Sequence, residues 1–323
     1  MSVRVLSAGY LTSVQDLGRA GFRQSGVSVG GALDSHALRV ANALVGNDDN
    51  AAGLEATLGK VRLQFEDRRI VAWGGGAFTV RINDEELPPG HAAQIGSGDE
   101  LLLTAPTTGA RAWLAISGGI DEPLVLGSRA TDLRGKFGGH EGRALRDGDL
   151  LPLGAAYLEV AWKDGRISEW GAPTPWASID AHGAVLRVVQ GADWDRFTVE
   201  AQRALLSGAY TVTPDSDRMG ARMEGLELKR LEASDLLSEA VAPGTLQVPP
   251  NGQPILLLAD CQTIGGYPKI AHVITVDLPL AAQLWPGDAV RFREVSLAEA
   301  QDLLREREED FARFRVGLSL QSP

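Results

Sequence analysis

The chain has 323 residues, enough for two domains of ordinary size. Hydrophobic residues make up 44% and charged residues 23%, as in ordinary globular proteins, and the net charge of −11 argues against a nucleic-acid partner, which would require clustered Lys and Arg. The sequence contains no apolar run of about 18 residues that could cross a membrane, no signal-peptide pattern and only one cysteine, Cys261, so we expect a cytoplasmic protein without internal disulfides.

Short strand-like runs dominate the pattern. They are rich in β-branched or aromatic residues, are bounded by Gly, Pro or Asp, and lie at 61–65, 69–73, 78–82, 100–105, 110–116, 185–190, 254–259 and 272–278. A Gly-Asp pair opens an apolar run at 98–99, 148–149 and 287–288, as turn chemistry requires. This recurrence suggests that a barrel-like unit occurs twice.

Helical periodicity is confined to a few segments. Segment 33–46 has apolar residues at helical spacing, with Asp34 as a suitable N-cap and Gly46 as the stop. The segments 193–208 and 296–315 repeat the pattern, and the second begins with a Ser-x-x-Glu capping box.

The Pro- and Gly-rich stretch 162–176 separates two regions of strand pattern. We place the domain boundary there, which gives an N-terminal domain of residues 1–170 and a C-terminal domain of residues 171–323 that ends in a helix. The sequence thus predicts a mainly β fold of two barrel domains with a few short helices.

Known motifs for phosphate, metal and biotin are incomplete. The stretch 53–61 has five residues between its glycines instead of four, and Val61 follows Lys60, so it fails the P-loop pattern. The histidines are scattered and one cysteine cannot build a structural zinc site, so we expect no structural metal. Methionines flank no lysine, so we expect no covalently attached biotin.

Polar residues gather near the N-terminus at Gln15, Asp16 and Arg19, around Gly18 and Gly21. They are candidates for a binding site. Because buried polar groups usually serve structure, a purely structural role in turns is the alternative.

A second candidate region is YTVTPDSDRMGARMEG at 210–225. Arg218 and Arg222 could each form two hydrogen bonds to a carboxylate or phosphate. Alternatively, Asp215 and Asp217 neutralise them in a rigid turn.

The third candidate region lies between two apolar runs, in ADCQTIGGYPKIAH at 259–272. Its polar or permissive members, together with Gln247, which sits between apolar residues on an earlier probable strand, are Asp260, Gln262, Gly265, Gly266, Tyr267 and Lys269. The two glycines permit positive φ and a close approach of backbone to ligand, and Pro268 stiffens the turn. The pattern indicates the rim of a binding site at a barrel mouth, although Gly-Gly and Tyr-Pro also occur in plain turns.

Blocks of unusual composition follow one another between about residues 3 and 293: TSVQDLGRAGFRQSGVSVGGALD, ANALVGN, GLEATLGK, LRGKFGGHEGRALRDGD, SDRMGARMEG, LSEAVAPGTLQVPPNGQPILLLAD and TIGGYPKIAHV. In this order they closely resemble the family of C-type 5-oxoprolinase subunits, whose members are also described as KipA-like proteins, allophanate hydrolase subunit 2 and biotin-dependent carboxyltransferases.

The resemblance implies two cyclophilin-like β-barrel domains and a heteromer with a KipI-like B-type subunit. With a further A-type subunit, such complexes cleave 5-oxoproline to glutamate with ATP as co-substrate. A small amide substrate would suit a pocket with Asp, Gln and Lys, since an amide offers both a donor and an acceptor.

Carried over by position, the resemblance implies catalytic roles for three residues. Arg218 would anchor a carboxylate or phosphate, Lys269 would stabilise charge on an amide oxygen or phosphoryl group, and Asp260 would orient the substrate or accept a proton. The implied substrate-binding residues are Arg222, Gln247, Gln262, Gly265, Gly266, Tyr267 and, in the first domain, Gln15, Asp16 and Arg19.

Two positions depart from the family pattern, in which Arg and Thr are expected where this chain has Cys261 and Ile264. The substitutions remove hydrogen-bond donors. If those donors bind the ligand, this chain would have an altered substrate or a mainly structural role. If the side chains face away, nothing would change.

Two other functions remain open on the sequence. One is a carboxyltransferase acting on urea or a similar amide, although the sequence shows no biotin-carrier segment. The other is a KipA-like regulatory protein that binds a KipI-like kinase inhibitor. The isolated chain has no complete ATP site, so activity is expected from a complex.

Overall fold

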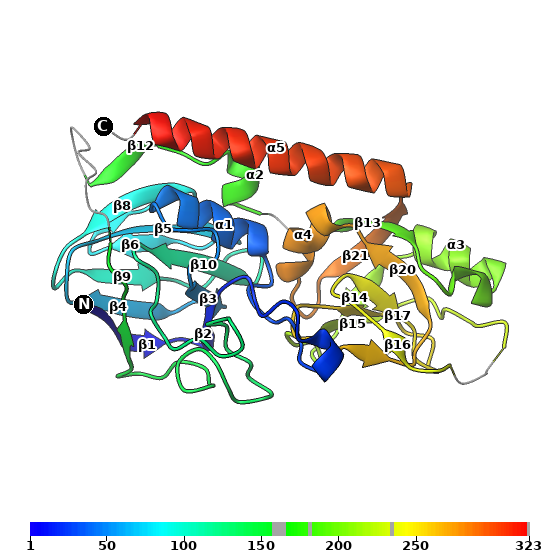
Figure 1. Ribbon diagram of the computed structural model, residues 1–323. Coiled ribbons are helices and arrows are strands. Elements are labelled where there is room, and N and C mark those ends of the chain that lie inside the picture. The colour runs from blue at the N-terminus through cyan, green and yellow to red at the C-terminus, as the bar shows by residue number, and fades with distance from the viewer. Residues whose placement is uncertain (157–165, 180–182, 233–235, 322–323) are drawn as a thin grey trace. The chain divides into compact units, whose positions relative to one another are not determined.

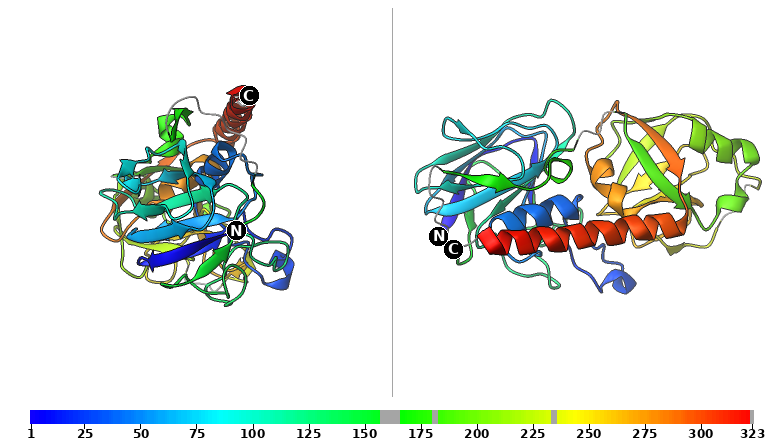
Figure 2. Two further views of the ribbon diagram at one scale, coloured as in Figure 1. Left: turned by 90° about the vertical axis from the view of Figure 1, so that its left-hand side faces the viewer. Right: turned by 90° about the horizontal axis from the view of Figure 1, so that it is seen from above.

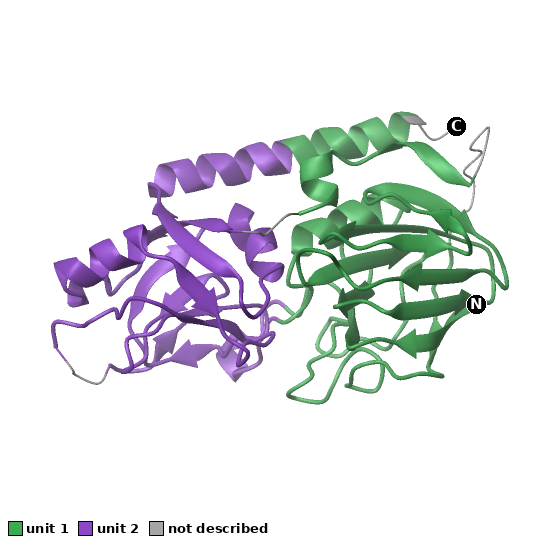
Figure 3. Cartoon of the chain, turned by 180° about the vertical axis from the view of Figure 1, so that it is seen from behind, with its two compact units in different colours: residues 1–19, 30–180, 310–323 green, residues 20–29, 181–309 purple. Residues whose placement is uncertain are grey.

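The computed structural model describes the chain except for residues 157–165, 180–182, 233–235 and 322–323 (Figure 1). The chain forms two compact units, coloured separately in Figure 3. Unit 1 comprises Met1–Arg19, Gly30–Asp180 and Asp310–Pro323, and unit 2 comprises Ala20–Val29 and Ala181–Glu309. The units are therefore interleaved in sequence, whereas the sequence analysis placed a single boundary at residue 170.

Unit 1 contains, in its described part, two six-stranded sheets whose paired neighbours all run antiparallel. The first sheet has the order β11 (Leu150–Pro152), β1 (Ser2–Ala8), β4 (Val61–Phe65), β9 (Glu100–Leu103), β6 (Val80–Ile82) and β7 (Glu85–Glu86). The second has the order β12 (Ile167–Gly171), β8 (His91–Ile95), β5 (Arg69–Gly75), β10 (Arg111–Ile116), β3 (Gly53–Thr57) and β2 (Leu11–Gln15).

Strand alternation explains how unit 1 builds its core. In β4, Val61, Leu63 and Phe65 are buried in the main apolar cluster, while Arg62 is exposed. Strand β5 is buried on both faces, because Val71 joins this cluster and the alternate side chains join a second one. A continuous apolar run is what a strand covered on both faces requires.

Helices cover the second face of β5. Helix α1 (Ser35–Leu44) begins at the predicted N-cap, where the Asp34 carboxylate accepts a hydrogen bond from the Ala37 N–H at 2.8 Å. The short helix α2 (Thr174–Ala177) and the last turns of α5 (Leu297–Gln321) complete this cluster, in which Phe311 is buried. Helix α5 extends six residues beyond the predicted end at 315, and its predicted capping hydroxyl, that of Ser296, accepts from the Glu299 N–H at 3.1 Å.

Unit 2 is a closed barrel, seen from above in Figure 2. Its strands follow the order β13 (Val185–Gln190), β20 (Lys269–Val273), β17 (Thr245–Gln247), β18 (Ile255–Leu257), β15 (Gly220–Glu224), β14 (Tyr210–Val212) and β21 (Ala289–Glu294). The barrel closes through the parallel pair β13–β21. A separate two-stranded sheet pairs β16 (Glu239–Ala240) with β19 (Ile264–Gly265).

Unit 2 also contains short helices. They are α3 (Val199–Ser207), α4 (Leu278–Ala282) and the 3₁₀ turns η1 (Arg23–Ser25), η2 (Trp194–Arg196) and η3 (Thr275–Asp277). None of the helices in the described part of the chain combines the length and apolar character that a bilayer crossing requires.

The predicted mainly β fold is confirmed, but two segments differ from prediction. The strand expected at 272–278 ends at Val273. Asp277 turns inward, where its carboxylate accepts from the Arg187 backbone N–H at 2.7 Å, and α4 starts at Leu278 with Pro279 in its first turn. The helix expected over 193–208 is divided: η2 comes first, and α3 starts only at its own N-cap, Thr198.

The predicted turn at 146–149 is anchored in unit 1 by the Asp149 carboxylate. Its oxygens accept from Arg143 Nη1 at 2.7 Å, from Arg143 Nη2 at 2.9 Å and from the Arg146 backbone N–H at 2.7 Å. The hydrogen bonds from Arg143 hold the pKa of Asp149 below its ordinary value of 3.8, against the opposing effect of burial.

We predict that Asp149→Asn lowers the free energy of unfolding of unit 1 by about 1–3 kcal/mol at neutral pH. The folded-state pKa is depressed, so the carboxylate stabilises the fold above the unfolded pKa and loses that effect as pH falls through the folded pKa. The melting temperatures of wild type and variant should therefore converge as the pH falls through the depressed pKa of the folded state. The exposed Asp84, changed to Asn, is the control and should leave the melting temperature unchanged throughout. A difference that persists undiminished in acid would contradict the prediction.

Candidate functional site

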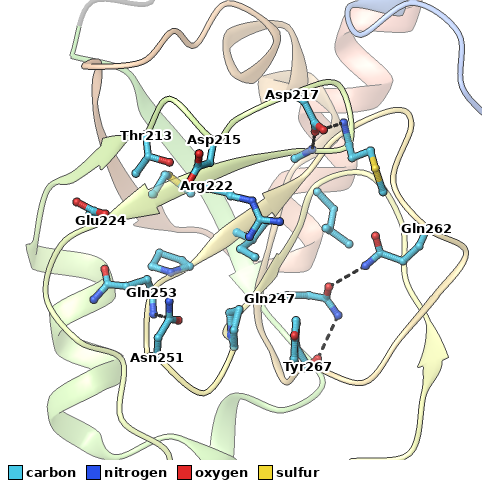
Figure 4. Close-up of a pocket in the computed structure, with 17 residues that line it drawn as sticks. Thr213, Asp215, Asp217, Arg222, Glu224, Gln247, Asn251, Gln253, Gln262 and Tyr267 are labelled. Carbon is cyan, nitrogen blue, oxygen red and sulfur yellow. Dashed lines mark hydrogen bonds between the residues drawn. The ribbon is translucent and has the colours of Figure 1, made fainter. Parts of the chain in front are cut away.

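A pocket of about 420 Å³ lies against the outer face of the unit 2 barrel (Figure 4). Its polar lining residues come from β15, β17 and the loops around them: Thr213, Asp215, Asp217, Arg222, Glu224, Gln247, Asn251, Gln253, Gln262 and Tyr267. The pocket is thus built from side chains of the barrel strands together with the loops that connect them.

Strand alternation decides which side chains reach the pocket. In β15, Ala221 and Met223 are buried, while the intervening Arg222 is exposed on the pocket side. In β18, Leu256 is fully buried and its neighbour Leu257 lines the pocket. Because successive side chains point to opposite faces, filling the barrel with one set directs the other set outward.

The loop before β15 is held by its own side chains. Asp217 Oδ1 accepts from the backbone N–H groups of Met219 at 2.7 Å and Gly220 at 3.2 Å. Ser216 Oγ accepts from the Arg222 N–H at 3.0 Å. These are local turn bonds of the kind that Asp and Ser provide, so the pocket wall is already ordered without a ligand.

The guanidinium of Arg222 has no hydrogen bond or ion pair with any residue that the structure describes, and Figure 4 shows it amid the pocket residues. Among the described residues, Asp215 and Asp217 therefore form no ion pair with Arg222, contrary to the alternative that they neutralise it. Arg222 is a cation available to an anionic ligand.

Arg218 and Asp260, two of the three predicted catalytic residues, are directed at each other. Arg218 Nε donates to Asp260 Oδ2 at 2.8 Å and Nη2 donates to Oδ1 at 3.1 Å, and Arg218 is buried. Neither residue lines the pocket. Their bidentate pair connects the loop before β15 to the loop after β18, and both loops contribute pocket residues.

Lys269, the third predicted catalytic residue, also lies outside the pocket lining. Its Nζ is 3.2 Å from Asp193 Oδ2 and 2.8 Å from Glu239 Oε2. Burial disfavours the charge of Lys269, but the hydrogen bonds that its ammonium group donates to these carboxylates outweigh this effect and raise its pKa. Lys269 is therefore a charged partner of two carboxylates, and its predicted role in catalysis stays a prediction.

A chain of carboxamides connects three predicted binding residues. Gln262 Nε2 donates to Gln247 Oε1 at 3.2 Å, and Gln247 Nε2 donates to the backbone carbonyl of Tyr267 at 3.2 Å. Gln247 is buried, whereas Gln262 is partly exposed to the pocket.

The adjacent glycines do not have positive φ, contrary to expectation. Gly265 instead allows close packing, because a Cβ there would lie 2.7 Å from Gln247 Nε2. A Cβ on Gly266 would meet Leu236 O at 3.3 Å, which is tight but less severe. The close approach to Gln247 is thus the reason for glycine at position 265.

The predicted residues of unit 1 form hydrogen bonds inside that unit. Asp16 accepts from Ser128 Oγ at 2.7 Å and from the Arg129 N–H at 2.6 Å, and Gln15 Nε2 donates to the Thr131 carbonyl at 3.3 Å. Arg19 donates to the carbonyl of Ala130 and lies over the ring of Phe137, 4.8 Å from its centroid. All three are buried and hold the segment 128–137 in place.

Several pocket residues were not predicted from the sequence as binding residues. Glu224 lies two positions after Arg222 on the same face of β15, a strand that the sequence analysis did not predict. Asn251 and Gln253 lie in PPNGQP, where turn chemistry alone accounts for their residue types, so the sequence carried no signal for them. Among the described residues, no group of three or more His, Cys, Asp or Glu is placed to hold a metal ion.

The two positions that depart from the family pattern lie in different environments. Cys261 is buried in a small apolar cluster with Val241 and Leu257, behind the pocket wall. Ile264 is 60% exposed on β19. Neither side chain lines the pocket.

Comparison with known proteins adds a family to this geometry. A family model described as the carboxyltransferase domain, subdomain A and B, matches residues 25–294. The chain is 42% identical to the C-type subunit of 5-oxoprolinase from Escherichia coli over 92% of this chain and 93% of the relative. It is 36% identical to the corresponding 5-oxoprolinase subunit of Haemophilus influenzae, with 95% of each chain covered.

A solved structure has the same fold within a longer chain. The urea amidolyase of Kluyveromyces lactis superposes with a TM-score of 0.89 at 30% identity, over 97% of this chain and 20% of that chain. This chain therefore corresponds to about a fifth of that protein.

We predict that Cys261 reacts slowly with thiol reagents in the native protein. Burial raises the pKa of its thiol to about 11, so the protonated, unreactive form dominates at pH 8. Labelling with a chromogenic disulfide should proceed at least about a hundredfold faster in denaturant, where pKa and access return to ordinary values. Rapid stoichiometric labelling of the folded chain would contradict the buried placement.

Proposed function

Because the chain belongs to the family of C-type 5-oxoprolinase subunits, within the wider carboxyltransferase-domain family, we propose that it is the C-type subunit of an ATP-dependent complex that cleaves 5-oxoproline to glutamate. The same proposal makes ATP a co-substrate of the complex and places the complex in the cytoplasm. The partners would be a KipI-like B-type subunit and an A-type subunit.

The observation that carries the proposal is the guanidinium of Arg222, which has no partner among the described residues and lies in a pocket lined by four carboxamides and three carboxylates. 5-Oxoproline has a carboxylate, which a guanidinium binds with two charge-assisted hydrogen bonds. It also has a ring amide, which neutral carboxamides can match as donor and acceptor. The pocket volume of about 420 Å³ is ample for so small a molecule.

The residues of this pocket would bind and orient the substrate. Arg222 would hold the carboxylate, and the ordered loop at 215–219 would keep the wall rigid, because Asp217 already satisfies its backbone donors. Orientation alone lowers a reaction barrier substantially when the reacting groups are aligned. The chemistry of ring opening would then need groups from the other subunits.

A carboxyltransferase acting on a urea-like amide is the second candidate, favoured by the similarity to the urea amidolyase structure. Urea has no carboxylate, so in that case Arg222 would have no anionic partner on the substrate. This difference separates the two candidates experimentally.

The test is reconstitution with the B-type and A-type subunits, followed by measurement of ATP hydrolysis and glutamate release. We expect both to depend on 5-oxoproline and on the presence of this chain. Stimulation by urea, with no response to 5-oxoproline, would favour the second candidate and overturn the first.

We predict that Arg222→Met raises the KM of the complex for 5-oxoproline by about 10- to 100-fold, because a charge-assisted hydrogen bond to the carboxylate is lost. The matched control is Arg293→Met, an exposed arginine on β21 outside the pocket lining, which should leave KM unchanged. An unchanged KM in Arg222→Met, with assembly intact, would remove this pocket from the substrate site.

A further inference from the structure

We propose that the side-chain oxygen of Gln262 accepts a hydrogen bond from an N–H group of the substrate. A hydrogen-bond chain that starts at a backbone carbonyl fixes which end of the Gln262 carboxamide faces the pocket. The inference rests on the proposed function for its ligand and goes beyond it by assigning specificity to one residue.

The direction of the chain is set at Tyr267. A backbone carbonyl oxygen can only accept, so Gln247 must turn its Nε2 toward it, and the two atoms are 3.2 Å apart. The Oε1 of Gln247 then faces Gln262 and can only accept. Gln262 must therefore donate its Nε2, at 3.2 Å, which determines the orientation of its own carboxamide.

The orientation leaves one strong acceptor unused. Gln262 Oε1 accepts no hydrogen bond from any of the described residues, and Gln262 lines the pocket. In Figure 4 the oxygen of Gln262 lies at the end of its carboxamide that does not face Gln247. A ligand in the pocket thus meets an acceptor at this position, and an N–H group is its natural partner.

Gly265 leaves the space that this arrangement of the two carboxamides occupies. A Cβ at position 265 would lie 2.7 Å from Gln247 Nε2 and 3.3 Å from Gln262 Nε2, so any side chain would displace the pair. Its φ lies outside the left-handed region, so the backbone conformation does not itself require glycine. Glycine is needed at this position because a side chain would clash with the hydrogen-bonded pair of Gln247 and Gln262.

Two ligand features follow. Arg222, which has no partner among the residues the structure describes, would bind a carboxylate of the ligand. Gln262 would accept a hydrogen bond from an N–H group of the ligand. The pocket should then distinguish a lactam acid from a ring of the same shape without the N–H. A site built to bond a polar group discriminates against analogues that lack it, since its own polar atom is left unpaired.

The experiment compares binding of 5-oxoproline and 3-oxocyclopentane-1-carboxylate, in which CH₂ replaces the ring N–H, to the reconstituted complex by calorimetry. We expect wild type to prefer 5-oxoproline by about tenfold, the effect of one hydrogen bond. Gln262→Met should lower this ratio to about one, mainly by weakening the binding of 5-oxoproline. Gln247→Met should also reduce the ratio, because the Gln262 carboxamide then loses the acceptor that fixes its orientation and is free to rotate.

The control is Gln190→Met, a residue on β13 whose Nε2 donates to Glu294 Oε1 outside the pocket, and it should keep the wild-type ratio. A tenfold ratio that persists in both Gln262→Met and Gln247→Met would overturn the inference while leaving the proposed function intact. Failure of the wild-type complex to bind or turn over 5-oxoproline would overturn the proposed function itself, and this inference with it.

Discussion

The requirement that every second side chain of a barrel strand fill the interior governs the site in unit 2. Leu246, Leu256 and Ala221 are buried on β17, β18 and β15. Their neighbours are therefore directed to the outside, where Arg222 and Gln247 line a common wall. The pocket is thus a consequence of core packing, and its chemistry is decided by which polar residues occupy the outward positions.

Charged residues near this wall divide into those that hold the structure and those left for a ligand. Arg218 and Asp260 neutralise each other with two hydrogen bonds, and Lys269 lies between two carboxylates. Breaking such a pair by removing one partner leaves an uncompensated buried charge, which is costly. Arg222 differs because the described residues give it no partner, so binding an anion there requires no existing bond to break.

The sequence predicted the local elements well and the pairings poorly. Runs such as 61–65 and 185–190 and the N-cap at Asp34 depend on neighbours in sequence, and the structure has them as predicted. An arginine that binds a carboxylate of the protein looks the same in sequence as one that binds a carboxylate of a substrate. Only the fold shows that Asp260, 42 residues away, is the partner of Arg218.

The Gly-Gly pair shows the same limit in steric terms. Glycine in a turn suggests positive φ, yet Gly265 is in an ordinary region and its lack of a side chain accommodates Gln247 from another strand. That contact links backbone geometry to recognition: the Tyr267 carbonyl orients Gln247, which orients Gln262. A carboxamide is neutral and can present either its NH₂ group or its oxygen to a ligand. The Tyr267 carbonyl can only accept, so it fixes the orientation of both carboxamides and leaves the Gln262 oxygen as the acceptor in the pocket.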